Sequence, residues 1–191
     1  MTEAETLIAD MTGRARVASR ALALASDAFK KDALMRAAAA LRERSSAIIA
    51  ANATDMEAGE KAGLSGAMLD RLKLDEARIA GIAAAVEHVA ILADPVGAII
   101  DSHIQPNGLK MQRVRVPIGV LGIIYESRPN VTADAAALGL RSGNAIILRG
   151  GSEAVNSNRA IHAAVVEGIT AAGLPADAVQ LVPTQDRVVV G

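Results

Sequence analysis

The sequence contains no cysteine and no tryptophan, and its only aromatic side chains are one phenylalanine and one tyrosine. Without a thiol, these 191 residues can form no disulfide, no thiolate metal site and no cysteine nucleophile. Phe29 and Tyr125 alone cannot build the aromatic platform on which nucleic-acid bases stack. The core must therefore be packed from aliphatic side chains.

The charge balance gives no sign of a macromolecular partner, and the histidines give no sign of a metal site. Lys and Arg total 20 against 21 Asp and Glu, so nothing indicates a nucleic-acid or anionic-membrane partner. The three histidines lie far apart without metal-ligand spacing, and we expect no metal site. No apolar run approaches the ~20 residues of a membrane span, and Thr2–Asp10 lacks the basic region of a signal peptide. We expect a soluble cytoplasmic protein.

Residues 1–95 have the apolar spacing of amphipathic helices. Two helices are indicated, the first by Leu7, Met11, Ala18 and Leu22, and the second by Leu34, Ala38, Leu41 and Ile48. The polar, glycine-containing segment Asn52–Ser65 is interpreted as a helix end and a loop. A third helix is expected from Asp75, where acids suit a helix N-terminus, to Asp94, which precedes a proline.

Residues 96–116 have the pattern of a β-hairpin. Val96–Ile104 and Leu109–Val116 flank a Pro-Asn-Gly sequence that is typical of a tight turn. Arg113 and Arg115 fall on one face of the return strand, which gives that strand a basic face. We expect a hairpin of this kind to project from the core.

Residues 117–191 alternate between strand and helix patterns. The expected elements are a strand at Ile118–Ile124 buried on both faces, a helix at Thr132–Arg141 followed by Gly143, a buried strand at Ala145–Leu148, a helix from an N-cap at Ser152 to about Ala172, and a strand at Val179–Val182. This β-α-β-α-β order predicts a parallel sheet with right-handed crossovers. The fold class is therefore α/β, with N-terminal helices, a projecting hairpin and part of a doubly wound sheet.

The last residues suggest a longer protein. Val188–Gly191 ends the sequence in an apolar stretch, where a further helix or strand would be expected to continue. We interpret the chain as an N-terminal fragment. The alternative is a complete small α/β domain whose tail happens to be apolar.

Two segments follow the predicted strands at the sheet edge where open parallel sheets bind ligands. Arg149–Glu153 joins a cation and two glycines to a helix start, a combination suited to a phosphate or ribose but also to a plain tight turn. Tyr125–Asn130 places hydrogen-bonding side chains ahead of the next helix. Its alternative interpretation is an N-cap by Asn130 or Thr132, with Arg128 in solvent.

Three strings give the chain a family resemblance. They are VPIGVLGIIYESRPNVT at Val116–Thr132, GLRSGN at Gly139–Asn144 and LRGGSEA at Leu148–Ala154. The chain resembles the gamma-glutamyl phosphate reductase family, also called glutamate-5-semialdehyde dehydrogenases, within the aldehyde dehydrogenase superfamily. The resemblance covers essentially the whole chain.

The resemblance implies a partial NADP-binding domain over residues 1–191, with a helical part at 1–95, an oligomerisation hairpin at 96–116 and a βαβαβ unit at 117–191. It places the nucleophilic cysteine in a catalytic domain absent from this chain, and it implies a homo-oligomer. The residues it assigns to the cofactor are Tyr125, Glu126, Ser127, Arg128, Pro129, Arg149, Gly150, Gly151, Ser152 and Glu153. Residues Arg149–Glu153 would face the adenosine, and residues Tyr125–Pro129 would face the nicotinamide and the reacting acyl group.

Two departures from the superfamily pattern affect these assignments. The superfamily's Lys-Pro-Ser-Glu segment contacts the adenosine ribose, whereas Arg149–Glu153 has one residue more, so either Arg149 or the Ser-Glu pair aligns. The superfamily's oxyanion-binding asparagine lies in Pro-Trp-Asn-Phe-Pro. Ser127 falls under that asparagine when Pro129 is matched, and Asn130 lies just beyond. Both are candidate oxyanion donors.

The resemblance implies an NADPH-dependent reduction of L-glutamyl 5-phosphate to L-glutamate 5-semialdehyde in proline biosynthesis. The rival hypothesis is a non-catalytic α/β module that binds a nucleotide or a partner subunit. A third possibility is another acyl-phosphate or aldehyde dehydrogenase, since we expect substrate-selecting residues beyond this chain.

Overall fold

The computed structural model describes residues 2–186 and contains seven α-helices and five β-strands in that range. The helices are α1 (Glu3–Leu24), α2 (Asp27–Glu43), α3 (Ser45–Lys61), α4 (Gly66–Leu72), α5 (Glu76–Ile91), α6 (Asn130–Arg141) and α7 (Val155–Ala171). The strands are β1 (Ile99–Ile104), β2 (Lys110–Val114), β3 (Val120–Ile124), β4 (Ala145–Arg149) and β5 (Val179–Leu181). Short 3-10 turns occupy Ser152–Ala154 and Ala176–Ala178.

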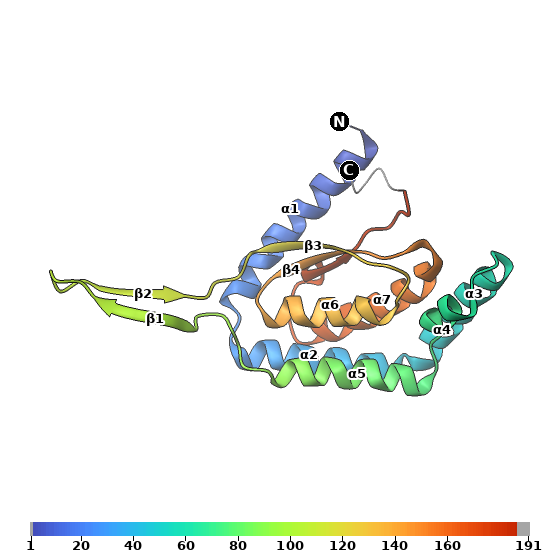
Figure 1. The fold of residues 1–191 in the computed structure, drawn as a ribbon, viewed down its shortest axis with the longest axis horizontal. Coiled ribbons are helices and arrows are strands. Elements are labelled where there is room, and N and C mark those ends of the chain that lie inside the picture. The colour runs from blue at the N-terminus through green and yellow to red at the C-terminus, as the bar shows by residue number, and fades with distance from the viewer. Residues whose placement is uncertain (1, 187–191) are drawn as a thin grey trace.

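The helices cover the small sheet in layers (Figure 1). Helix α1 packs on one side of the sheet, α6 and α7 pack on the other, and α2 and α5 form an outer layer beneath them. The core is aliphatic, as the composition requires, and is rich in alanine. Helices α2 and α7 approach so closely that a Cβ at Gly168 would lie 2.4 Å from the Ala37 backbone.

The helical prediction is confirmed at its ends and wrong in the middle. Helices α1 and α5 form where expected, and the Asp75 side chain caps α5 by accepting from the Arg78 N–H. The predicted second helix is two helices, because the chain bends at Arg44 without a glycine or proline. Segment Asn52–Ser65 is mostly helix rather than loop, since α3 continues to Lys61. The short helix α4 was not predicted.

The sheet is parallel, with the strand order β3-β4-β5, as expected. The prediction that Ile118–Ile124 is buried on both faces is wrong. Strand β3 lies at the edge of the sheet, and Ile118 and Ile124 are 80% and 61% exposed. The central strand β4 is the buried one.

Both crossover helices are present, but both start elsewhere than predicted: α6 begins at Asn130 rather than Thr132, and neither of these side chains caps it. Helix α6 ends as expected, with Gly143 at a φ of +77° donating to the Leu140 carbonyl. Ser152 is not the N-cap of the next helix. It begins a 3-10 turn, and α7 starts only at Val155.

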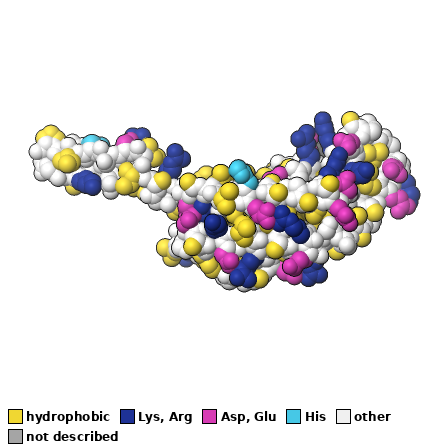
Figure 2. Space-filling model, turned by 90° about the horizontal axis from the view of Figure 1, so that it is seen from below, with side chains coloured by type: hydrophobic (Ala, Val, Ile, Leu, Met, Phe, Trp, Pro, Cys, Tyr) yellow, Lys and Arg dark blue, Asp and Glu magenta, His cyan; other side chains and the backbone are white. Residues whose placement is uncertain are grey.

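The hairpin of β1 and β2 is confirmed as an antiparallel pair that projects from the body (Figures 1 and 2). Every residue of both strands is exposed. The turn closes on Gly108, whose φ of +85° lies in the left-handed region that favours glycine. Apolar as well as basic side chains are exposed there, among them Ile104 and Met111.

Two further observations concern the limits of the chain. The apolar segment Val188–Gly191, on which the fragment interpretation rested, lies outside the described residues. Within residues 2–186, no helix combines the length and the apolar character needed to cross a lipid bilayer.

Candidate functional site

A cavity of about 650 Å³ lies at the carboxyl ends of β3 and β4. Eight of the ten predicted cofactor-binding residues line it, namely Tyr125, Glu126, Ser127, Arg128, Arg149, Gly151, Ser152 and Glu153. The remaining lining residues are Leu64, Met68, Arg71, Leu72, Ile124 and Gln185. The sheet topology therefore brings the two predicted loops together, and α4 supplies an additional wall.

The loop after β3 is held by a buried hydrogen-bond chain. Thr132 donates to the Asn158 Oδ1 at 3.1 Å, so the Tyr125 hydroxyl, 2.8 Å from Thr132 Oγ1, is the donor of that pair. Burial raises the pKa of Tyr125, while its hydrogen bond to Thr132 acts in the opposite direction. The phenol therefore stays neutral and fixes the loop against α6 and α7.

The two candidate oxyanion donors are placed differently. Ser127 lines the cavity, and its hydroxyl donates to the Glu153 carboxylate. Asn130 lies outside the lining, and its amide donates to Asp134 at 2.9 Å. Pro129 is buried and does not line the cavity either.

Arg149 is half-buried at the end of β4. Its Nη2 donates to the Gln185 carbonyl at 3.0 Å, while its buried Nε has no partner among residues 2–186. The Ser127 hydrogen bond lowers the pKa of Glu153, and the charge of Arg149 contributes in the same direction. Glu153 is therefore ionised at neutral pH beside a cation that keeps an unused donor.

Gly150 and Gly151 are required by packing within the chain. A Cβ at Gly150 would lie 2.2 Å from Asn158 Nδ2 and 3.0 Å from the Tyr125 ring. A Cβ at Gly151 would lie 2.2 Å from Ser127 Oγ. The space left by each missing side chain is therefore filled by the chain itself rather than kept for a ligand, although Gly151 still lines the cavity.

The start of α7 is occupied by a carboxylate from α3. Asp55, 3% exposed, accepts from the backbone N–H groups of Asn156 at 3.2 Å and Ser157 at 2.7 Å. It also accepts from both of their side chains, at 2.8 and 2.6 Å. The expectation that this helix start offers free N–H groups to a phosphate is wrong for these two residues.

Asn52, one turn before Asp55, attaches α4 to the same point. Its Nδ2 donates to the Leu72 carbonyl at 2.8 Å and to Ser157 Oγ at 3.0 Å. Its Oδ1 accepts from the Leu74 N–H at 2.7 Å. Asn52 and Asp55 therefore fix the end of α4, which lines the cavity, relative to the start of α7. The only feature of the sequence that could have indicated this role was the i,i+3 spacing of Asn52 and Asp55, which puts both on one face of a helix.

No protein-family model matches the chain. A curated gamma-glutamyl phosphate reductase from Sphingopyxis alaskensis is 68% identical over 189 residues, which is 99% of this chain. Over nearly its whole length, this chain is therefore similar to gamma-glutamyl phosphate reductases. It spans 44% of the length of that relative.

Solved structures agree with this assignment. Gamma-glutamyl phosphate reductase from Thermotoga maritima is 42% identical with a TM-score of 0.93, and the match covers 96% of this chain and 44% of that protein. An acetylating aldehyde dehydrogenase from Geobacillus thermoglucosidasius shares the fold at 14% identity and a TM-score of 0.73, over 98% of this chain and 39% of its own. The architecture is therefore an aldehyde dehydrogenase fold over the part that this chain contains.

Proposed function

We propose that the full-length protein containing this chain reduces L-glutamyl 5-phosphate to L-glutamate 5-semialdehyde with NADPH, as a step of proline biosynthesis in the cytoplasm. The observation that carries this proposal is the 68% identity to a curated gamma-glutamyl phosphate reductase across nearly the whole chain. A non-catalytic module is not favoured, since the similarity extends through every element of the fold, with a TM-score of 0.93 to a solved reductase.

The reaction divides between this chain and the rest of the protein. Because these 191 residues contain no cysteine, the thiolate that displaces phosphate from the acyl carbon must come from the remaining part. Bound NADPH supplies the hydride that converts the resulting thioester into the aldehyde and releases the thiolate. This chain would bind and orient the reactants.

The residues at the cavity suit those tasks. The guanidinium of Arg149 gives the end of β4 a cation for a phosphate oxygen, and Ser152 and Glu153 offer acceptors for ribose hydroxyls. Ser127 is the better placed oxyanion donor of the two candidates, because it faces the cavity and Asn130 does not. Its hydroxyl would have to leave Glu153 to serve the substrate.

The assay runs in the oxidative direction, with glutamate semialdehyde, phosphate and NADP⁺. We expect turnover from the full-length protein and none from the isolated 191-residue chain, because no other residue here replaces the thiolate. A full-length protein without turnover would contradict the proposed function. Turnover by the isolated chain, with host enzyme excluded, would contradict the division of labour.

We also propose that the β1–β2 hairpin pairs with a second copy of the protein. Its two strands are exposed throughout and carry apolar side chains, which a partner would cover. Deleting Ser102–Lys110 from the full-length protein should lower its mass in light scattering. An unchanged mass would contradict this role.

A further inference from the structure

Helix α4 and the loop before it form one wall of the cavity. Leu64, Met68 and Leu72 line it with apolar side chains, and Arg71 adds a single cation. Positions 68, 71 and 72 follow the i,i+3 and i,i+4 spacing of one helix face, so the charge lies directly beside the aliphatic side chains. This wall faces the loops after β3 and β4.

Arg71 differs from the other arginines around α4 in having no partner. Within residues 2–186 it forms no hydrogen bond or ion pair, although it lines a cavity that also holds Glu126 and Glu153. Arg78, by contrast, binds the Asp70 carboxylate at 2.7 Å and the Lys73 carbonyl at 2.9 Å. The guanidinium of Arg71 is therefore free to bind a ligand.

The backbone that carries Arg71 is held in place. The Leu72 carbonyl, at the end of α4, accepts from Asn52. Leu72 itself is 1% exposed, so the last turn of the helix is anchored by packing as well. A fixed backbone reduces the conformational entropy lost when the side chain binds a ligand.

A guanidinium beside the accessible apolar side chains of Leu64 and Met68 suits a carboxylate at the end of a short carbon chain. The polar groups of a diphosphate or a ribose would gain little from these two side chains. In the substrate of the proposed function, the α-carboxylate is joined to the reacting acyl group by three carbons. We propose that Arg71 binds this α-carboxylate and makes the enzyme specific for substrates that carry one. This inference rests on the proposed function.

The test compares two aldehydes in the full-length enzyme. Glutamate 5-semialdehyde carries the carboxylate, and 4-aminobutanal is the same molecule without it. We expect Arg71→Ala to lower kcat/KM for glutamate semialdehyde by roughly 10- to 100-fold. The value for 4-aminobutanal and the KM for NADP⁺ should not change. Arg71→Lys should restore part of the discrimination, because it keeps the charge without the bidentate geometry.

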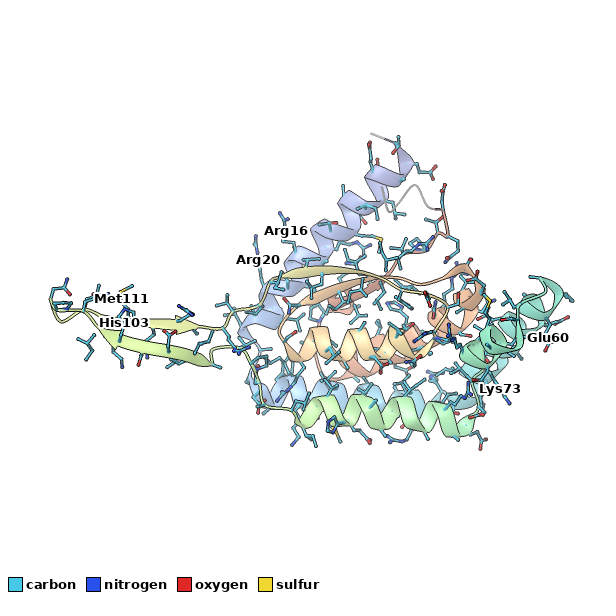
Figure 3. All side chains as sticks on the ribbon, in the orientation of Figure 1. Arg16, Arg20, Glu60, Lys73, His103 and Met111 are labelled. Atoms are coloured by element: carbon cyan, nitrogen blue, oxygen red, sulfur yellow. The ribbon has the colours of Figure 1, made fainter. Side chains whose placement is uncertain are left out.

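Lys73→Ala is the matched control. Lys73 is an exposed cation two residues away, but its side chain lines a separate groove with Glu57 and Glu60 (Figure 3). This variant should behave as the wild type. Since Arg71 is exposed and unpaired, Arg71→Ala should also keep the wild-type unfolding temperature.

Each other outcome has a distinct meaning. A wild-type enzyme inactive on glutamate semialdehyde would reject the proposed function itself. An active wild type with an unchanged Arg71→Ala variant would overturn the role of Arg71. Equal losses for both aldehydes together with a raised KM for NADP⁺ would also overturn it, and would assign Arg71 to the cofactor.

Discussion

Helices α6 and α7 both begin after a parallel strand at the same edge of the sheet, yet their first turns are completed in opposite ways. The start of α7 is closed by the buried carboxylate of Asp55, which accepts four hydrogen bonds. The start of α6 has no side-chain cap, and within residues 2–186 its neighbouring carboxylate, Asp134, accepts only from Asn130.

The difference shows that a helix start beside a ligand cavity is not by itself an anion site. At α7 the protein supplies its own anion, and that anion comes from α3, about a hundred residues earlier in the chain. The positive charge at the cavity is therefore provided by side chains, namely Arg71, Arg128 and Arg149. The helix dipole of α7 is used to hold α3 in place.

The largest effect is expected from Asp55→Ala. The change removes a buried carboxylate and leaves the N–H groups of Asn156 and Ser157 unsatisfied. We expect a loss of roughly 3–5 kcal/mol in the free energy of unfolding, measured by urea denaturation. Asp134→Ala at the other helix start should cost less than about 1 kcal/mol. Equal losses would mean that the two starts do not differ.

The second effect concerns the turn that precedes α7. Gly150→Ala places a methyl group against Asn158 and Tyr125, the residues that link this turn to α6 through Thr132. We expect a destabilisation of about 1–3 kcal/mol from overpacking, by the same denaturation experiment. Gly122→Ala on β3 is the control, because a Cβ there meets nothing within 4 Å. A neutral Gly150→Ala would show that the turn can relax.

Local patterns predicted much of this fold. Apolar periodicity located α1 and α5, the Pro-Asn-Gly turn located the hairpin, and the alternation of strands and helices predicted a parallel sheet. The errors arose where non-local contacts decide the outcome. Asn52 and Asp55 resemble loop residues in sequence, but inside α3 they are buried because α4 and α7 satisfy them. The exposure of β3 likewise depends on which strands lie beside it.

The candidate site, too, was predicted where local patterns decide it and missed where non-local contacts do. The end of a parallel strand is a place that topology alone can predict, and the loops after β3 and β4 do share one cavity. The α4 wall could not be predicted, because nothing local indicates that residues 64–72 pack opposite those loops. The sequence pattern also could not predict whether the Arg149 side chain is hydrogen-bonded within the chain, since its partner, Gln185, lies in a different segment.

Arg149→Ala tests whether an arginine side chain, rather than the start of α7, binds the phosphate of the cofactor. In the full-length enzyme we expect NADPH binding to weaken by roughly 10- to 100-fold, with NADH little changed, because only NADPH offers a 2′-phosphate to a guanidinium. Kd values for both cofactors, measured by fluorescence titration, would show this. Equal losses for the two cofactors, or no loss for either, would mean that Arg149 does not bind the 2′-phosphate.

The smallest effect is expected at the uncapped start of α6, from Asp134→Asn. Burial raises the pKa of Asp134, and the hydrogen bond from Asn130 only partly offsets this. A carboxyl whose pKa is raised on folding binds its proton more tightly in the folded state. Its contribution to stability is therefore present at low pH and is lost as pH rises from the unfolded pKa, near 3.9, through the folded one.

The Asp134→Asn variant keeps an acceptor for Asn130 but has no carboxyl to ionise. Urea denaturation at pH 4 and pH 7 should show a smaller fall in stability for Asp134→Asn than for the wild type, by less than about 1 kcal/mol. An identical fall in both proteins would show that Asp134 has the same pKa in the folded and unfolded states. Burial at the start of α6 would then not destabilise its charged form.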